Sequence, residues 1–420
     1  MAVLPQALGG SAERADAAAF VEAERARAAT GRELLARIAP ERDAPGGAAP
    51  DPAVPSLDSL RGRIGPDRAL LVYRLGTPHT SLWAVTREGW RRFDLPEAAA
   101  IEARIDTLRE RIVRPDLAVS LQAQRSARRL YMMLVASAEP MLREKREIAI
   151  VPDGALWLLP FETLLALEPT AEGRVPRRGY LIERWSVAYA VSAEAAAAPP
   201  PRDILGGVLA LGDPLYANLE APGGEAPVPA LPGTAFELAV LDQQARGREN
   251  VTLVGTEATR ARLLGEPLFA DAGVIHLATH AIAVDDDPER SGLWLAAGED
   301  DGPGHLKAAD IAGLELRARL VALTQCETSD VGAHAGRGVL TLTGAFFAAG
   351  AQQVMLSLWK PIDRSNGVLL DRFYRDYLRK GHSAPEALAE AKRLLLRKPE
   401  TRSPFLWASL VVVEGAGAMR

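Results

Sequence analysis

Two stretches decide the fold, 273-GVIHLATH-280 and 317-RARLVALTQC-326. Each is a short apolar run bounded by polar residues, which predicts a buried β-strand. The first run ends in His280 and the second in Cys326, the single cysteine of the chain. If both strands belong to one parallel sheet, their carboxyl ends share an edge. We therefore expect an imidazole and a thiol to meet at that edge.

Further apolar runs of the same kind occur from residue 147 onward, at 147–151, 207–211, 251–254 and 353–359. Helical segments, such as 236–244 and 338–349, lie between them. Strands that are apolar throughout are typical of a parallel sheet covered on both faces. The sequence therefore predicts an α/β sandwich with a mostly parallel sheet flanked by helices. Ligand chemistry is expected at the carboxyl ends of its strands.

The region before residue 147 has a different pattern. Residues 11–39 form an Ala-, Glu- and Arg-rich helical stretch, and residues 40–55 have the composition of a linker. Three short strand candidates, 69–73, 81–85 and 90–95, predict a small antiparallel meander. Helical stretches follow at 97–113 and 119–142. Near the other end, Ser383 and Glu386 have the spacing of a capping box that begins a helix.

Composition excludes several classes of protein. Hydrophobic residues make up 48% and charged residues 25% of the chain, and the net charge is −5. No basic field suited to nucleic acid is present, and a cluster of basic residues is interpreted as the solvated face of a helix (Lys392, Arg393, Arg397, Lys398). No apolar stretch approaches the ~20 residues that span a bilayer, and no secretory signal is visible. We expect a cytoplasmic protein without membrane contact, and its one cysteine cannot form an internal disulfide.

Both candidate residues have structural alternatives. A free cysteine often packs as a small buried hydrophobe, but the polar residues 327–330 after Cys326 favour the rim of the sheet. His276 and His280 could suggest a metal site. On a strand, however, residues four apart are separated by about 13 Å, too far to share one ion. No HExxH or CxxC motif occurs, so neither a metal nor another cofactor is predicted.

The chemistry that fits a neighbouring thiol and imidazole is attack on an acyl carbon. The imidazole takes the proton from the thiol, and the thiolate is the nucleophile. The oxyanion of the tetrahedral intermediate needs preorganised donors, and we expect them to be the backbone N–H groups of Cys326 and Ala281. No third, orienting residue is evident. Asp330 and Asp363 are candidates, although each is typical of a loop or helix cap.

The residues also resemble a known family, the CHAT-domain proteins, which are caspase-like cysteine peptidases related to separase. The motifs occur in family order over roughly residues 60–420. They are the meander ALLVYRLG…LWAVTREGW, IVPDGALWLLPFETLL (150–165), YLIERWSVAYAVS (180–192), LALGDPLY (209–216), LPGTAFEL (231–238), VIHLATHA (274–281), SGLWLA (291–296), ALTQCETS (322–329), GAFFAAGAQQVMLSLWKPID (344–363) and SPFLWASLVVVEG (403–415).

The resemblance implies a caspase-like fold in which an inactive caspase-like half precedes an active one. It divides the chain into residues 1–55 (N-terminal helix and linker), 56–202 (meander and inactive half) and 203–420 (active half). His280 falls on the catalytic histidine of the family and Cys326 on its nucleophile. The chain departs from the family at Ser329, where glycine is common, and from caspases at Ala281, where they have glycine.

Few residues of the sequence indicate the substrate specificity. Related metacaspases carry an acidic residue two positions before the cysteine, where this chain has Thr324. The acidic triplet Asp285, Asp286 and Asp287 could supply charge for a basic side chain, although such a triplet before Pro288 is more typical of a solvated turn. Trp359, which ends the last apolar run, is a further candidate contact.

Three functions are therefore compatible with the sequence. The first is a cysteine endopeptidase that cuts one or few cytoplasmic proteins, such as the product of a neighbouring gene, in bacterial defence or regulated cell death, under the control of a regulatory partner. The second is a CHAT scaffold that acts as an interaction module without catalysis. The third is a metal-dependent or other hydrolase.

Overall fold

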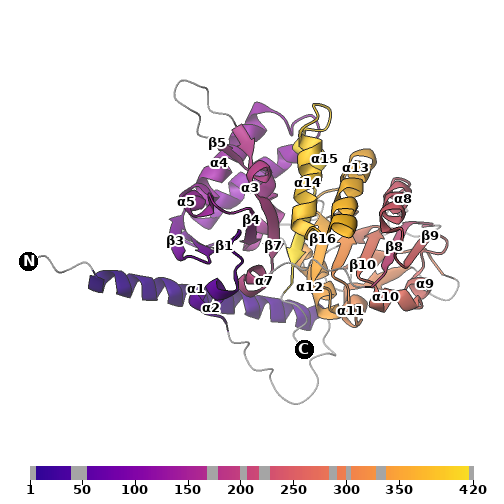
Figure 1. Cartoon of the computed structure of the whole chain (residues 1–420), viewed down its shortest axis with the longest axis horizontal. Helices are drawn as coiled ribbons and strands as arrows, with labels where there is room; N and C mark the ends of the chain where they lie inside the picture. Colours follow the sequence, from indigo (N-terminus) through magenta and orange to yellow (C-terminus); the bar gives the residue numbers. More distant parts are fainter. Residues whose placement is uncertain are drawn as a thin grey trace, which may run out of the picture.

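A computed structural model describes residues 6–38, 54–167, 178–198, 206–216, 228–282, 291–298, 304–327 and 337–415. Within them, the largest sheet has eleven strands in the order β3-β2-β1-β4-β7-β17-β16-β14-β10-β8-β9, and helices flank it (Figure 1). The predicted α/β class, with a large and mostly parallel sheet, is confirmed.

The strands on one side of the sheet are those that the apolar runs predict. They are β8 (Val208–Pro214), β9 (Asn250–Gly255), β10 (Val274–Ala278), β14 (Leu320–Leu323) and β16 (Gln353–Ser357). All neighbouring pairs among them are parallel. Strands β10, β14 and β16 are buried at every position, because helices cover a parallel sheet on both faces.

The predicted antiparallel meander is also present at the other end of the sheet. It consists of β1 (Arg68–Arg74), β2 (Thr80–Thr86) and β3 (Trp90–Leu95). Strand β1 continues the sheet through parallel pairing with β4 (Glu147–Val151), and β4 pairs in parallel with β7 (Ser186–Ala190).

The direction of the strands reverses in the middle of the sheet. Strand β17 (Leu410–Glu414) is antiparallel to β16 on one side and parallel to β7 on the other. The carboxyl ends of β1, β4 and β7 therefore lie at the edge opposite to those of β8, β10, β14 and β16. Strands from both sides of the predicted division near residue 202 thus belong to one sheet. The assignment of an inactive and an active half remains a prediction.

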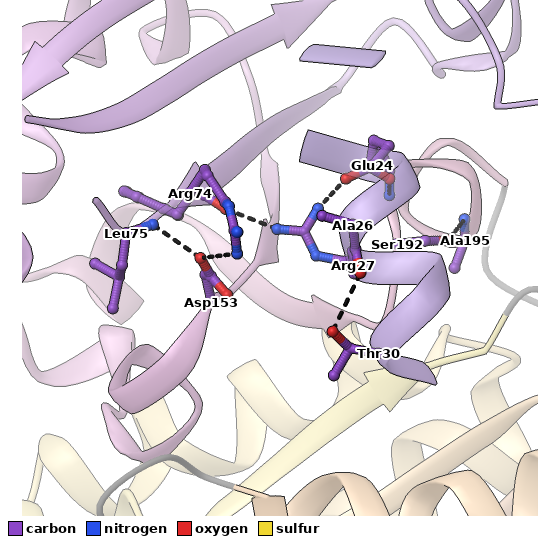
Figure 2. Close-up of polar contacts among 11 residues, drawn as sticks. Glu24, Ala26, Arg27, Thr30, Arg74, Leu75, Asp153, Ser192 and Ala195 are labelled. Atoms are coloured by element: carbon purple, nitrogen blue, oxygen red, sulfur yellow. Dashed lines mark hydrogen bonds and ion pairs between the residues drawn. The ribbon is translucent and has the colours of Figure 1, made fainter. Parts of the chain in front are cut away.

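Helix α1 (Gln6–Ile38) packs through Phe20 and Ala23 on one face of the N-terminal strands, and it also contacts backbone groups near the carboxyl ends of β1 and β7 (Figure 2). Arg27 forms an ion pair with Glu24 and donates to the carbonyl of Tyr73 near the end of β1, at 2.6 Å. Glu24 also accepts a hydrogen bond from the backbone N–H of Ala193 at 2.9 Å, just after β7. Side chains of α1 thus provide the hydrogen-bond partners of two backbone groups at this edge, the Tyr73 carbonyl and the Ala193 N–H.

The longer helices around the sheet are α3 (Ala98–Ile112), α4 (Leu121–Leu134), α8 (Thr234–Ala245), α12 (Arg337–Ala349), α13 (Asp363–Tyr374) and α14 (Ala384–Leu396). The predicted helix 119–142 is divided into α4, a 3₁₀ turn Ala136–Ala138 and α5 (Glu139–Leu142). The capping box of Ser383 and Glu386 at the start of α14 is confirmed. None of the helices in the described ranges has the length and apolar character needed to cross a bilayer.

Short elements complete the fold. They are α2 (Leu57–Arg63), the 3₁₀ turns Gly154–Leu158 and Phe161–Thr163, β5 (Leu165–Leu167), β6 (Arg178–Tyr180), α6 (Leu181–Arg184), α7 (Ala193–Ala197), α9 (Arg260–Leu264), α10 (Pro267–Asp271), β11 (Ala281–Ile282), β12 (Gly292–Trp294), β13 (His305–Lys307), α11 (Ala308–Ala312), β15 (Cys326–Glu327), a π-helical turn Arg375–Arg379 and α15 (Pro404–Trp407).

One member of the basic cluster does not lie on a solvated surface, and the interpretation from sequence is wrong for it. Lys392 on α14 is 1% exposed, and its ammonium group donates to the Glu162 carboxylate at 2.6 Å. The Tyr189 hydroxyl lies 2.7 Å from the other oxygen of Glu162. The cation is buried because a carboxylate distant in sequence is buried opposite to it.

A second buried group of charges surrounds Glu414, the last residue of β17. Arg68 forms ion pairs with Glu414 and, at 3.2 Å, with Glu147. The Gln353 amide lies 3.5 Å from the Glu414 carboxylate. Burial, together with the second carboxylate of Glu147, raises the pKa of Glu414 to about 7, against the lowering effect of Arg68.

Replacing Lys392 by Met should destabilise the protein strongly. The substitution keeps the packing volume but leaves the Glu162 carboxylate buried without its cation, at a cost of about 3–5 kcal/mol. Urea denaturation followed by circular dichroism measures the change. Lys398→Met, at an exposed lysine just beyond the same helix, is the matched control and should stay within ~0.5 kcal/mol of wild type. Equal effects of the two variants would contradict the role of the buried pair.

The Glu414 carboxyl should make stability depend on pH. Its pKa is higher in the folded protein than in the unfolded chain, so its contribution is complete below about pH 4.5 and is lost as the pH rises through about 7. Glu414→Gln removes this titration. The free energy of unfolding of the variant should therefore rise relative to wild type between pH 5 and 8, by up to about 3 kcal/mol. A difference that is constant over this range would refute the assignment, and exposed Glu400→Gln is the control.

Candidate active site

The register of the sheet brings the two residues of interest to one edge. Strands β10 and β14 are parallel neighbours, with Leu277 opposite Leu323. Beyond them, β11 and β15 form another parallel pair in which Ala281 lies opposite Cys326. His280 immediately precedes Ala281. The backbones that carry the imidazole and the thiol are thus adjacent, while the sulfur itself lies outside the described side chains.

The pairing shifts by one residue between these two strand pairs. Paired positions differ by 46 in β10 and β14 but by 45 in β11 and β15. The histidine segment therefore has three residues, Ala278 to His280, where the cysteine segment has two, Thr324 and Gln325. The change falls where the chain passes between two sheets, because β11 and β15 belong to a separate four-stranded sheet in the order β13-β12-β11-β15.

The His280 ring is held by a backbone carbonyl. Its side chain is buried, and Nε2 lies 2.8 Å from the carbonyl oxygen of Pro229. A carbonyl can only accept, so Nε2 must carry a proton in this hydrogen bond. In the neutral imidazole the proton-accepting nitrogen is then Nδ1. The Pro229 carbonyl has the position of the orienting group that the sequence does not identify.

Tyr216 contacts the same histidine through both its hydroxyl and its ring. Its hydroxyl accepts from the backbone N–H of His280 at 3.3 Å and lies 2.6 Å from the Thr279 hydroxyl. The two rings pack with their centroids 5.5 Å apart. Burial raises the pKa of Tyr216 to about 12, so the phenol keeps its proton at neutral pH. On the opposite side, Trp294 donates its backbone N–H to the His280 carbonyl at 2.9 Å.

The residues before Cys326 are anchored in the interior. The Thr324 hydroxyl donates to the Glu237 carboxylate at 2.6 Å, and the Gln325 amide donates to its other oxygen at 2.8 Å. All three side chains are at most 2% exposed. Trp359 is also buried and donates from Nε1 to the carbonyl of Phe405 at 3.2 Å. The substrate-binding role of Thr324 and Trp359 stays a prediction, and their described contacts are with the protein itself.

Other predicted residues cannot be placed in the site. Asp285, Asp286, Asp287 and Asp330 lie outside the described residues, and of Asp363 only the backbone, at the start of α13, is described. His276 contacts Tyr374 through Nδ1 at 2.8 Å, and its Nε2 lies 3.5 Å from Glu237. Among the described residues, no group of three or more His, Cys, Asp or Glu side chains could hold a metal ion.

Three elements of the site escaped the sequence interpretation. The Pro229 carbonyl has no sequence signal, because every residue carries a carbonyl. Tyr216 and Glu237 do fall within quoted motifs, at the end of LALGDPLY and within LPGTAFEL. Glu237 also lies on a helical segment dominated by apolar residues. A glutamate on the buried face of such a helix is a sequence signal for a buried polar partner, since an unpaired charge is costly there.

Comparison with known proteins gives two related proteins of much greater length. Tetratricopeptide repeat protein 28 from Homo sapiens is 24% identical over 335 residues, which is 68% of this chain and 13% of the relative. The Mus musculus protein of the same name is 24% identical over 339 residues, with the same shares. The chain therefore spans only about an eighth of each of these relatives.

Among solved structures, the chain is similar to separase in the Saccharomyces cerevisiae separase–securin complex. Two crystal structures, at 3.0 and 2.6 Å resolution, match 85% of this chain with a TM-score of 0.50 and 9% identity, and the match covers 30% and 31% of the separase chain. This similarity shows a shared caspase-like fold. A family model for the CHAT domain matches residues 124–415, and the chain accordingly belongs to the CHAT domain family.

Proposed function

We propose that this protein is a caspase-like cysteine endopeptidase in which Cys326 is the nucleophile and His280 the general base. The observation that supports it best is the parallel pairing of Ala281 with Cys326. It makes the residue after the histidine a direct neighbour of the cysteine backbone. The Pro229 carbonyl on Nε2 supports the base role, because it leaves Nδ1 to exchange the proton.

In the proposed reaction His280 takes the proton of the Cys326 thiol, and the thiolate forms a bond to the carbonyl carbon of the scissile peptide. The backbone N–H groups of Cys326 and Ala281 are proposed to stabilise the oxyanion. The imidazolium then protonates the leaving amine as the C–N bond breaks. Water attacks the resulting thioester with His280 as base and restores the free enzyme. The residues assigned to these steps need neither a metal nor a cofactor.

We further propose that the substrate is one or few cytoplasmic proteins, for instance the product of a neighbouring gene. Bacterial defence or regulated cell death is the proposed setting. Separase in the similar structures is bound to securin, which supports a regulatory protein partner for this chain as well. The described contacts of Thr324 and Trp359 are with the protein itself. We therefore propose that the acidic triplet 285–287 determines a preference for a basic side chain in the substrate.

Labelling with a thiol-directed peptidyl probe tests the proposal. The wild-type protein should be labelled at Cys326, Cys326→Ala should not be labelled, and His280→Ala should react at least about a hundredfold more slowly, because the base is lost. His382→Ala, which changes a histidine in the loop before α14, is the control and should react at the wild-type rate. A folded protein that is not labelled would favour the alternative of a non-catalytic interaction module.

Removing the Tyr216 hydroxyl should slow the same reaction. Tyr216→Phe keeps the ring that packs on His280 but deprives the backbone N–H of His280 of its acceptor. A small displacement of the base is expected to lower the labelling rate about tenfold. Tyr131→Phe removes a hydroxyl that lies 2.7 Å from Glu139, far from β10 in sequence, and should leave the rate unchanged. If both variants react alike, Tyr216 does not position the histidine.

A further inference from the structure

Glu237 on α8 is a fully buried carboxylate on which polar side chains from three other elements converge. Thr324 and Gln325, which follow β14, donate to its two oxygens at 2.6 and 2.8 Å. The Asn366 amide of α13 donates at 2.7 Å. From β10, Nε2 of His276 lies 3.5 Å away. A carboxylate has about four acceptor positions. Three hydrogen bonds, from Thr324, Gln325 and Asn366, are made to Glu237, while the buried Nε2 of His276 has no hydrogen-bond partner among the described residues.

The neighbouring tyrosine favours the same arrangement. The Tyr374 hydroxyl lies 2.8 Å from Nδ1 of His276. Burial, followed by the nearby charge of Glu237, raises the pKa of Tyr374 well above its ordinary value. The phenol therefore stays protonated, and when it donates to Nδ1 the ring proton of His276 lies on Nε2, beside Glu237.

The location of this cluster links it to the proposed nucleophile. Thr324 and Gln325 are the two residues between the end of β14 and Cys326, where the regular pairing of β10 with β14 has ended at Leu277 and Leu323. Both side chains are buried and donate hydrogen bonds to the same carboxylate, that of Glu237. Gln325 directly precedes the Ala281–Cys326 pair. Glu237 thus holds the two residues at the place where the chain passes from the eleven-stranded to the four-stranded sheet.

We propose that Glu237 is a positioning residue, which holds the 324–325 segment and thereby sets the place of the Cys326 backbone relative to Ala281. This inference rests on the proposed function for its catalytic consequence, but its structural part can be tested alone. Glu237 does not touch the reacting atoms. It acts through Thr324 and Gln325.

The main variant is Glu237→Gln. A carboxamide has the same shape but offers one acceptor oxygen where the carboxylate offers two, so the donors of one side lose their partner or turn over. The matched control is Glu162→Gln. Glu162 is equally buried, but it lies in the 3₁₀ turn Phe161–Thr163, and among the described residues its carboxylate is bonded to Tyr189 and Lys392, neither of which belongs to β14.

The first readout is hydrogen exchange of the segment 320–327 measured by mass spectrometry. Glu237→Gln should raise exchange in this segment about tenfold, because local opening becomes easier. Glu162→Gln should leave exchange there at the wild-type level. This measurement needs no catalytic activity, so it tests the anchor even if the peptidase proposal fails.

The second readout is the kinetics of Cys326 labelling by the peptidyl probe. Glu237→Gln should lower the maximal rate about tenfold while the half-saturating probe concentration changes less than twofold, because binding is kept and alignment is lost. Thr324→Val, which removes one donor without a change of shape, should act in the same direction. The two substitutions together should cost less than the sum of their separate effects, since they break one contact.

The inference is overturned if Glu237→Gln leaves both readouts at wild-type values, or if Glu162→Gln changes the 320–327 segment to the same extent. Additive effects of Glu237→Gln and Thr324→Val would also contradict it. Absence of labelling in the wild-type protein would overturn the peptidase proposal instead, with the exchange experiment still deciding the anchor.

Discussion

The parallel pairing of β10 with β14 is the constraint on which the site depends. His280 and Cys326 are far apart in sequence, and only a shared sheet edge gives them a reason to meet. The pairing Ala281–Cys326 continues that neighbourhood beyond the regular strands. The register changes by one residue where the chain passes from the eleven-stranded sheet to the four-stranded sheet β13-β12-β11-β15. His280 lies in this passage, directly before the residue that pairs with Cys326.

The reversal of strand direction at β17 gives the sheet two carboxyl edges that are used differently. One edge carries His280 and Cys326. At the other edge, Arg27 and Glu24 of α1 bind backbone groups near the end of β1 and just after β7. Two buried ion pairs join N-terminal and C-terminal segments of the chain. Arg68–Glu414 joins β1 to β17, and Lys392–Glu162 joins α14 to the 3₁₀ turn Phe161–Thr163. Buried ion pairs contribute little net stability but are costly to break singly, so they favour one relative arrangement of the parts.

Much of this fold can be predicted from local sequence, because apolar runs and a capping box depend on nearby residues. The parallel strands, the meander and the start of α14 are examples. Lys392 shows where such prediction ends. In sequence it belongs to a basic helical stretch, and its burial depends on Glu162, 230 residues away. The Pro229 carbonyl is a stronger case, since a backbone oxygen leaves no trace in residue identity and only the folded chain reveals its partner. Residue type identified the histidine and the cysteine, whereas their supports required the structure.

The two members of the proposed dyad are supported by separate sets of residues. His280 is held by Pro229 and Tyr216, and the segment before Cys326 is held by Glu237. Among the described contacts, no side chain of one set bonds to the other set directly. The relation between imidazole and thiol therefore depends on the backbone pairing that joins the two strands, with each set limiting motion on its own side. A sheet is a stiff connection for this purpose, because its hydrogen bonds and packing change together rather than singly.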